Sequence, residues 1–198
     1  MWRSLGWTVA ASSFAAASVT TPLLTEPRVS HATGLAEKKG TTSLEPPPLL
    51  ATLVDIHGDE HLPLDASSPD AARFNALLAD RATGATEALD PRLFDLLRSL
   101  ATDHKGARIE LVSGYRSPKL NEMLRKKGHH VATHSQHSLG HALDFRMILP
   151  GESEPVDPRD LEKAIRTHGW TGGIGVYLAT GDRFVHADVG PNRRWNGQ

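Results

Sequence analysis

Three proline residues fix where helices begin between residues 90 and 170 of this chain. They stand in the pairs Asp90-Pro91, Ser117-Pro118 and Asp157-Pro158. Proline fits the first position of a helix, and a preceding Asp or Ser side chain can accept a hydrogen bond from the free N–H groups there. The pairs therefore predict helices from residue 91, from 118 to 127 and from 158 to 168. Ser67-Ser68-Pro69-Asp70 predicts one more, running to about Arg81.

Segments with the composition of strands lie around these helices. Residues 50–56 and 61–64 flank Gly58-Asp59-Glu60 and predict a β-hairpin, in which Pro63 places the second arm at a sheet edge. Further strands are expected at residues 108–112, 142–148, 173–178 and 184–189, with the last two paired. The predicted fold class is α+β, a small antiparallel sheet with flanking helices.

The first 48 residues differ in composition from the remainder. Residues 1–25 combine one arginine, a moderately apolar run and the small residues 15–18, which is typical of a secretory signal peptide or N-terminal leader. The alternative is a disordered tail. Hydroxyl residues interrupt the run too often for a stable membrane span, so membrane contact is expected only through an uncleaved leader. Residues 26–48, with Pro46-Pro47-Pro48, predict a flexible linker and leave residues 49–198 as the folded domain.

Histidine is abundant and cysteine is absent, with 11 histidines among 198 residues. Thiolate metal sites are therefore excluded, and any metal must be held by imidazole, carboxylate or water. The absence of cysteine also suits an exported protein of the periplasm or cell wall. The formal net charge of −1 gives no general basic field, so no nucleic-acid partner is expected.

Residues 135–144 and 183–190 contain the most informative pattern. A loop that turns at Gly140 can bring His137 to the same point as Asp144 on the following strand. His186 lies on another strand, and Asp188 shares its face. Two imidazoles and one carboxylate are ligands that catalytic zinc takes, with a fourth position left for water. The alternative is a buried, hydrogen-bonded cluster without metal.

The same residues resemble a known family. Ser135, His137, Gly140, Ala142 and Asp144 match the S-x-H-x-x-G-x-A-x-D pattern of the M15 metallopeptidases. The chain is most similar to the DUF882, or YcbK-like, subgroup of exported murein endopeptidases. That similarity extends over residues 50–195 and includes the segments Gly114-Tyr115-Arg116-Ser117, Val185-His186-Ala187-Asp188-Val189-Gly190-Pro191 and Arg194-Trp195. It implies the fold of Hedgehog signalling domains and D-Ala-D-Ala peptidases.

The resemblance also implies roles for particular residues. His137, Asp144 and His186 would hold one Zn²⁺, and Arg116 would face the substrate carbonyl and stabilise the tetrahedral oxyanion. Three further residues are expected to contact substrate or orient the ligands: Tyr115, Ser135 and Arg194.

The general base is not settled by the resemblance. Many M15 enzymes place an acid three residues before the last ligand, where this chain has Arg183, and others place a histidine two residues before it, where it has Phe184. Asp188 and Asp182 are the available acids, and strand periodicity favours Asp188. Asp188 could equally fix the tautomer of an imidazole.

The predicted function is hydrolysis of an amide bond in peptidoglycan peptides by a zinc metallopeptidase, in cell-wall remodelling. Cleavage of cross-links is favoured by the resemblance, whereas the residues leave D,D and L,D bonds, and endopeptidase and carboxypeptidase action, open. The alternatives are a zinc-containing module that binds peptidoglycan without cleaving it and a surface that binds a protein partner.

Overall fold

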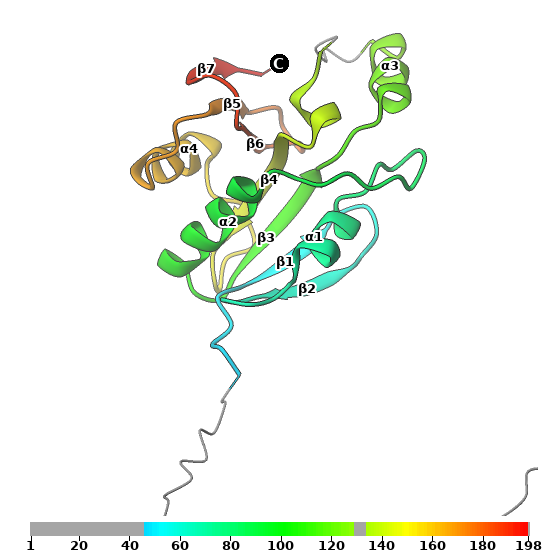
Figure 1. The fold of residues 1–198 in the computed structure, drawn as a ribbon. Coiled ribbons are helices and arrows are strands. Elements are labelled where there is room, and N and C mark those ends of the chain that lie inside the picture. The colour runs from blue at the N-terminus through cyan, green and yellow to red at the C-terminus, as the bar shows by residue number, and fades with distance from the viewer. Residues whose placement is uncertain (1–45, 129–133, 198) are drawn as a thin grey trace, which may run out of the picture. The chain divides into compact units, whose positions relative to one another are not determined.

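Residues 46–128 and 134–197, which the computed structural model describes, form a seven-stranded mixed sheet with helices packed against it (Figure 1). The predicted leader and most of the predicted linker lie outside the described residues. The strand order is β2-β1-β3-β4-β6-β5-β7. The strands are β1 (Ala51–Asp55), β2 (His61–Leu64), β3 (Ala107–Ser113), β4 (Ala142–Ile148), β5 (Gly173–Tyr177), β6 (Phe184–Asp188) and β7 (Arg193–Asn196).

The sheet confirms the α+β class and corrects the expected small antiparallel sheet. β1 and β2 form the predicted antiparallel hairpin, and β2, which contains Pro63, is an edge strand. However, β1 also pairs in parallel with β3, because the two helices between them return the chain to the start of the sheet. At the other edge β7, which sequence analysis did not predict, pairs in parallel with β5.

The α-helices of the described residues are α1 (Ala71–Leu77), α2 (Pro91–Asp103), α3 (Pro118–Lys126) and α4 (Pro158–Thr167). The last three begin at the predicted prolines. The residue before each proline caps its helix: the side chains of Asp90, Ser117 and Asp157 accept hydrogen bonds from the backbone N–H groups of Arg92, Leu120 and Arg159, respectively. Within residues 46–128 and 134–197, no helix combines the length and apolar character needed to cross a membrane.

Helix α1 ends before the predicted position at Arg81, and the reason is Asp80. The buried carboxylate of Asp80 accepts the backbone N–H groups of Ala82 (2.9 Å) and Thr83 (2.8 Å) through Oδ1. These local bonds replace helical ones and turn the chain. Oδ2 of Asp80 accepts the N–H of Ser117 (2.6 Å), which ties this turn to the start of α3.

The sheet has one apolar face and one polar face. Leu143, Phe145 and Met147 of β4 are buried in a core that also contains the apolar residues of α1, α2 and α4. Successive strand residues point to opposite faces. The other face therefore carries Asp144 of β4 with His186 and Asp188 of β6, all buried. The candidate site therefore lies on this polar face of the sheet and not in the apolar core.

Candidate metal centre

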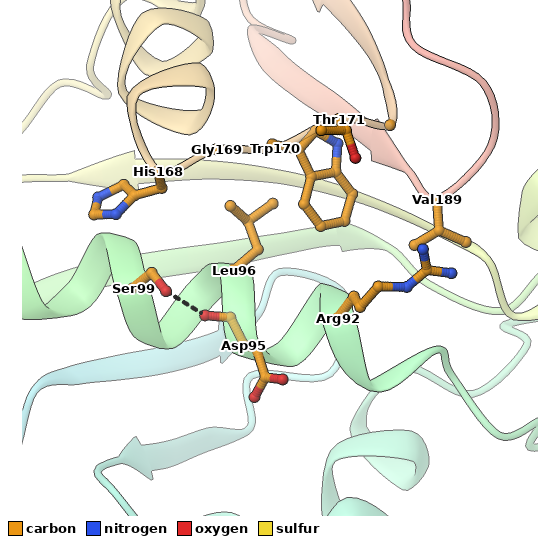
Figure 2. A pocket seen from close by; sticks show the side chains of 10 residues that line it. Arg92, Asp95, Leu96, Ser99, His168, Gly169, Trp170, Thr171 and Val189 are labelled. Carbon is orange, nitrogen blue, oxygen red and sulfur yellow. Dashed lines mark hydrogen bonds between the residues drawn. The ribbon is translucent and has the colours of Figure 1, made fainter.

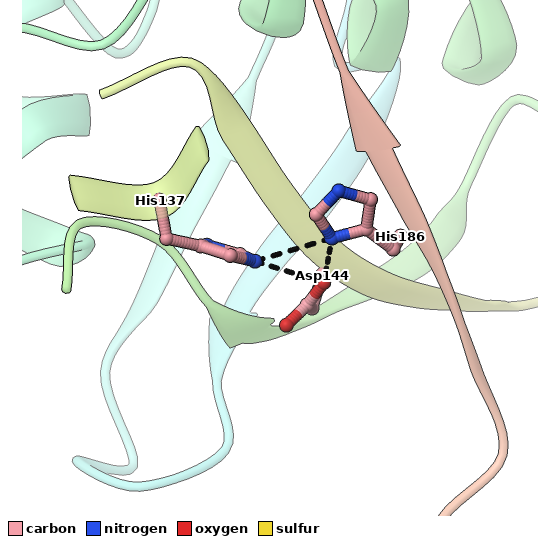
Figure 3. A group of neighbouring side chains, drawn as sticks. All are labelled: His137, Asp144 and His186. Carbon is pink, nitrogen blue, oxygen red and sulfur yellow. Dashed lines mark hydrogen bonds and ion pairs between the residues drawn. The ribbon is translucent and has the colours of Figure 1, made fainter. Parts of the chain in front are cut away.

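Three side chains from three elements meet on the polar face (Figure 3). His137 comes from the short 3-10 helix η1 (Gln136–Leu139), Asp144 from β4 and His186 from β6. Asp144 and His186 are direct partners across the antiparallel β4–β6 pair. Gly140 ends η1 with φ of 69°, a left-handed conformation that glycine adopts without strain, and a side chain there would meet the carbonyl of Ala88.

The three ligand atoms are close to one another. Nδ1 of His186 lies 2.8 Å from Oδ1 of Asp144, and Nε2 of His137 lies 3.2 Å from both of these atoms. Zinc bonds of about 2.0–2.2 Å in a tetrahedral site place ligand atoms about 3.3–3.6 Å apart. The three atoms thus need to move apart only slightly to hold one ion. The predicted ligand set is brought together as a group.

Hydrogen bonds on the far side of each ring orient the histidines. Nδ1 of His137 lies 2.7 Å from the carbonyl oxygen of Gly114, which can only accept, so this nitrogen carries the proton and Nε2 is free for a metal. Nε2 of His186 lies 3.1 Å from Oδ2 of Asp188, which leaves Nδ1 facing Asp144. Such outer contacts are typical of metal-binding histidines.

Burial and charge shift the pKa values of this group in different directions. Burial lowers the pKa of His137, although Asp144 opposes the effect. Burial also acts to lower the pKa of His186, but the hydrogen bonds and charges of Asp144 and Asp188 outweigh it and raise that pKa to about 9. Burial opposes ionisation of Asp144, yet both histidines hold its pKa well below the usual value. The carboxylate is therefore ionised and ready to bind a cation.

The donors fit zinc better than calcium or magnesium. Ca²⁺ and Mg²⁺ prefer oxygen ligands, whereas two imidazole nitrogens and one carboxylate oxygen match a catalytic zinc site with a position left for water. All three side chains are buried, and His186 is the most exposed of them at 8%.

A family model described as peptidoglycan L,D-endopeptidase MepK, Peptidase_M15_2, matches residues 65–195, a span that contains all three ligands. The chain belongs to the Peptidase_M15_2 family. The probable peptidoglycan L,D-endopeptidase MepK of Haemophilus influenzae is 31% identical over 161 residues, which is 77% of this chain and 81% of that protein. The peptidoglycan L,D-endopeptidase MepK of Escherichia coli (strain K12) is 32% identical over 158 residues, 76% of this chain and 81% of that protein. No solved structure matches the chain, so the likeness to Hedgehog domains stays a prediction.

In this Peptidase_M15_2 chain the side chain of Arg116 contacts Asp144, one of the three predicted metal ligands. Its Nη2 donates to Oδ2 of Asp144 (3.0 Å) and to Oγ of Ser113 (2.9 Å), and the side chain is buried. Arg116 thus directs the second carboxylate oxygen of Asp144 away from the metal position and leaves Oδ1 to bind. Its Nε is buried without a hydrogen-bond partner among the described residues.

The other expected site residues have different surroundings. Ser135 is buried at the start of η1, two residues before His137. Tyr115 lines a small pocket with His57 and Arg81, between β3 and the end of α1. Arg194 points to α4, where its Nε donates to Glu162 (3.1 Å). Ser135 is thus buried close in sequence to His137, and Arg194 has its partner on α4, so the roles expected for these residues stay predictions.

The two candidate bases have distinct environments. Asp182 is exposed in the turn before β6. Asp188 is fully buried, and its Oδ2 contacts Nε2 of His186, while the nitrogen at the metal position is Nδ1 on the other side of the ring. Burial opposes ionisation of Asp188, but hydrogen bonds from His186 and Gly190 hold its pKa below the usual value.

Strand β7 contributes two further residues to this site, Arg193 and Trp195. Nη2 of Arg193 donates to Oδ2 of Asp188 (2.9 Å), and the ring of Trp195 lies 5.2 Å from that of His186. Gly175 of β5 lies under Trp195, where a side chain would approach the indole to 2.6 Å. In the sequence, Gly173 and Gly175 lie two residues apart and therefore on the same face of the strand. Glycines at this spacing indicate that another group packs closely against that face.

Proposed function

We propose that this chain is a zinc-dependent peptidase that hydrolyses an amide bond in the peptide part of peptidoglycan. The observation that carries the proposal is the convergence of Nε2 of His137, Oδ1 of Asp144 and Nδ1 of His186 within 3.2 Å of one another. Membership of the Peptidase_M15_2 family supports the substrate class. An L,D bond in a cross-link is favoured, since both the family model and the relatives carry that activity in their names.

In the proposed hydrolysis, the zinc ion and the side chains around it have different roles. Zinc in such a site lowers the pKa of bound water and polarises an amide carbonyl. Asp144 supplies the negative charge, and Arg116 holds its carboxylate in one orientation through the 3.0 Å bond to Oδ2. Asp188 accepts the outer N–H of His186 and so keeps Nδ1 directed at the metal position.

Asp188 therefore fits the second of its two expected roles, that of fixing an imidazole, better than that of general base. The contact to His186 Nε2 and the ion pair with Arg193 occupy the same oxygen, Oδ2, while Gly190 N–H donates to Oδ1 (2.8 Å). Both oxygens of Asp188 therefore have partners, and they lie on the Nε2 side of the His186 ring, away from Nδ1. Asp188 is thus poorly placed to take a proton from a water at the metal position.

Export belongs to the same proposal. Peptidoglycan lies outside the cytoplasmic membrane, so a chain that cleaves it has to leave the cytoplasm, in agreement with the leader expected in residues 1–25. The periplasm or cell wall is the proposed location.

The test combines zinc content with release of muropeptides from purified sacculi. Wild type should bind one zinc and release fragments, and a chelator or His137→Ala should abolish both. A protein that binds one zinc and binds sacculi, yet releases nothing, would instead be a non-catalytic peptidoglycan-binding module.

A further inference from the structure

A second concave site lies where α2 approaches the connection between α4 and β5. It is a cavity of about 250 Å³, and Figure 2 shows the residues that line it. None of the metal ligands is among them. Its size is just below the range of about 300–1,000 Å³ that is usual for small-molecule sites, so it suits one ring rather than an extended chain.

The cavity has an apolar floor and a polar rim. The indole of Trp170 extends from the α4–β5 connection toward α2, beside Leu96 and Val189 (Figure 2). Arg92, Ser99 and Thr171 also line the cavity, although the Ser99 hydroxyl donates to the carbonyl oxygen of Asp95 within α2 (2.8 Å). Arg92 binds Asp90 through Nε and Nη2, which leaves Nη1 as a donor for a ligand.

The wall that carries Trp170 is held in place. Nη1 of Arg166 in α4 donates to the carbonyl oxygens of Trp170 (2.7 Å) and Gly172 (2.9 Å). The indole N–H of Trp170 is directed at the carbonyl of Gly173 (3.4 Å), which fixes the ring orientation. A site formed before the ligand arrives loses less conformational entropy on binding.

The cavity and the metal centre share a segment of backbone. Val189 lines the cavity and directly follows Asp188, which contacts His186. The N–H of Val189 donates to the carbonyl of His141 (3.0 Å), at the end of the loop that carries His137. Because adjacent strand residues point to opposite faces, the two places lie on different sides of β6, and a substrate in contact with both has to extend past the end of that strand.

We propose that this cavity binds one N-acetylated sugar ring of the glycan strand to which the peptide substrate is attached. A pyranose ring has a face of C–H groups and a rim of hydroxyl and amide groups, which matches the apolar floor and the polar rim described above. Aromatic side chains supply large, rigid apolar surfaces of this kind. The inference rests on the proposed function for the nature of the substrate, and it adds a glycan subsite to the peptidase.

Binding is tested with a soluble oligomer of β-1,4-linked N-acetylglucosamine and the full-length, zinc-loaded chain. The indole N–H resonance of Trp170, assigned by its loss in Trp170→Phe, should shift on titration. Arg92→Ala should weaken binding about fivefold, as expected for loss of one hydrogen bond of about 1 kcal/mol.

Arg159→Ala is a closely matched control. Arg92 and Arg159 both follow an Asp-Pro pair at a helix start, both donate their backbone N–H to that aspartate, and their side chains are 62% and 60% exposed. Only Arg92 lines the cavity. Arg159→Ala should leave sugar binding unchanged.

Hydrolysis gives a second measurement. Arg92→Ala should raise KM for a glycan-bearing muropeptide about fivefold and leave KM for a sugar-free stem peptide unchanged. The inference is overturned if the oligomer leaves the Trp170 resonance in place, if both arginine variants weaken binding equally, or if the stem peptide alone shifts that resonance. Retained sugar binding by a chain that releases no muropeptides would support the cavity and refute the proposed function.

Discussion

Oδ2 of Asp188 lies 3.1 Å from Nε2 of His186, on the opposite side of the ring from the nitrogen that faces Asp144. This contact leaves Nδ1 of His186 as the nitrogen that can bind a metal, because an outer hydrogen bond fixes both the tautomer and the orientation of the ring. The role of Asp188 can be separated experimentally from that of a general base.

Asp188→Asn should weaken zinc binding about 10- to 100-fold, the usual cost of losing a partner of a metal-binding histidine. Competition with a chromophoric chelator measures this affinity. Asp182→Asn, in the exposed turn before β6, is the control and should bind zinc as wild type does. An Asp188→Asn variant that keeps wild-type zinc affinity and has lost hydrolysis would show instead that Asp188 is the base.

Zinc binding at neutral pH should release close to one proton. Without metal the pKa of His186 is about 9, so its imidazole is protonated at neutral pH, whereas burial holds the pKa of His137 low. Zinc needs the unprotonated nitrogen, and affinity should therefore rise about tenfold per pH unit up to about pH 9. Calorimetry in two buffers of different ionisation enthalpy counts the protons.

The same shift predicts how the zinc-free protein responds to pH. The pKa of His186 is higher in the folded chain than its ordinary value of 6.5, so its protonation stabilises the fold below pH 6.5. That contribution is lost as the pH rises to about 9. Urea denaturation across this interval should show a decline that His186→Gln lacks. Zinc uptake without proton release, or a flat stability profile, would contradict a raised pKa.

Arg116→Ala should lower the free energy of unfolding of the zinc-free protein by about 3 kcal/mol, because it removes one partner of a buried ion pair and leaves Asp144 short of positive charge. Arg108→Ala is the matched control. Arg108 also pairs with a carboxylate at 3.0 Å, that of Glu110, but its side chain is half exposed, and such pairs contribute about 1 kcal/mol or less. Equal losses in urea denaturation would show that Arg116 has no special role at the metal centre.

Local sequence signals predicted the elements that hold the ligands. Residues 142–148 form β4 with the expected bounds, and the helices after Asp90, Ser117 and Asp157 begin at their prolines. These features depend on short-range chemistry, namely side-chain capping and strand periodicity. The motif that runs from Ser135 to Asp144 contains two of the three side chains that the structure brings together.

Features set by tertiary contacts were not predicted. β7 consists of the polar sequence Arg-Arg-Trp-Asn and has no apolar alternation, so only its pairing with β5 makes it a strand. The assignment of Arg194 to the site followed from the resemblance. The structure shows that the neighbouring residue Arg193 faces Asp188, because adjacent strand residues point to opposite faces.

This alternation provides a test in which two neighbouring residues act as each other's control. Arg193 and Arg194 have side chains that are equally exposed, at 43%, and each donates to one acid. Arg193 contacts Asp188, which contacts His186, whereas Arg194 contacts Glu162 on α4. Arg193→Ala should therefore weaken zinc binding about three- to tenfold, less than Asp188→Asn, since Gly190 still donates to Asp188.

Arg194→Ala should leave zinc affinity unchanged, and Arg193→Lys should recover part of the loss, because lysine restores the charge without the planar guanidinium. Chelator competition on the three variants measures these differences. Equal effects of Arg193→Ala and Arg194→Ala would show that general charge at the C-terminal strand matters, and not the Arg193–Asp188–His186 contact. A loss confined to Arg193→Ala would show that β7, an edge strand remote in sequence from His137 and Asp144, helps to set the geometry of the metal centre.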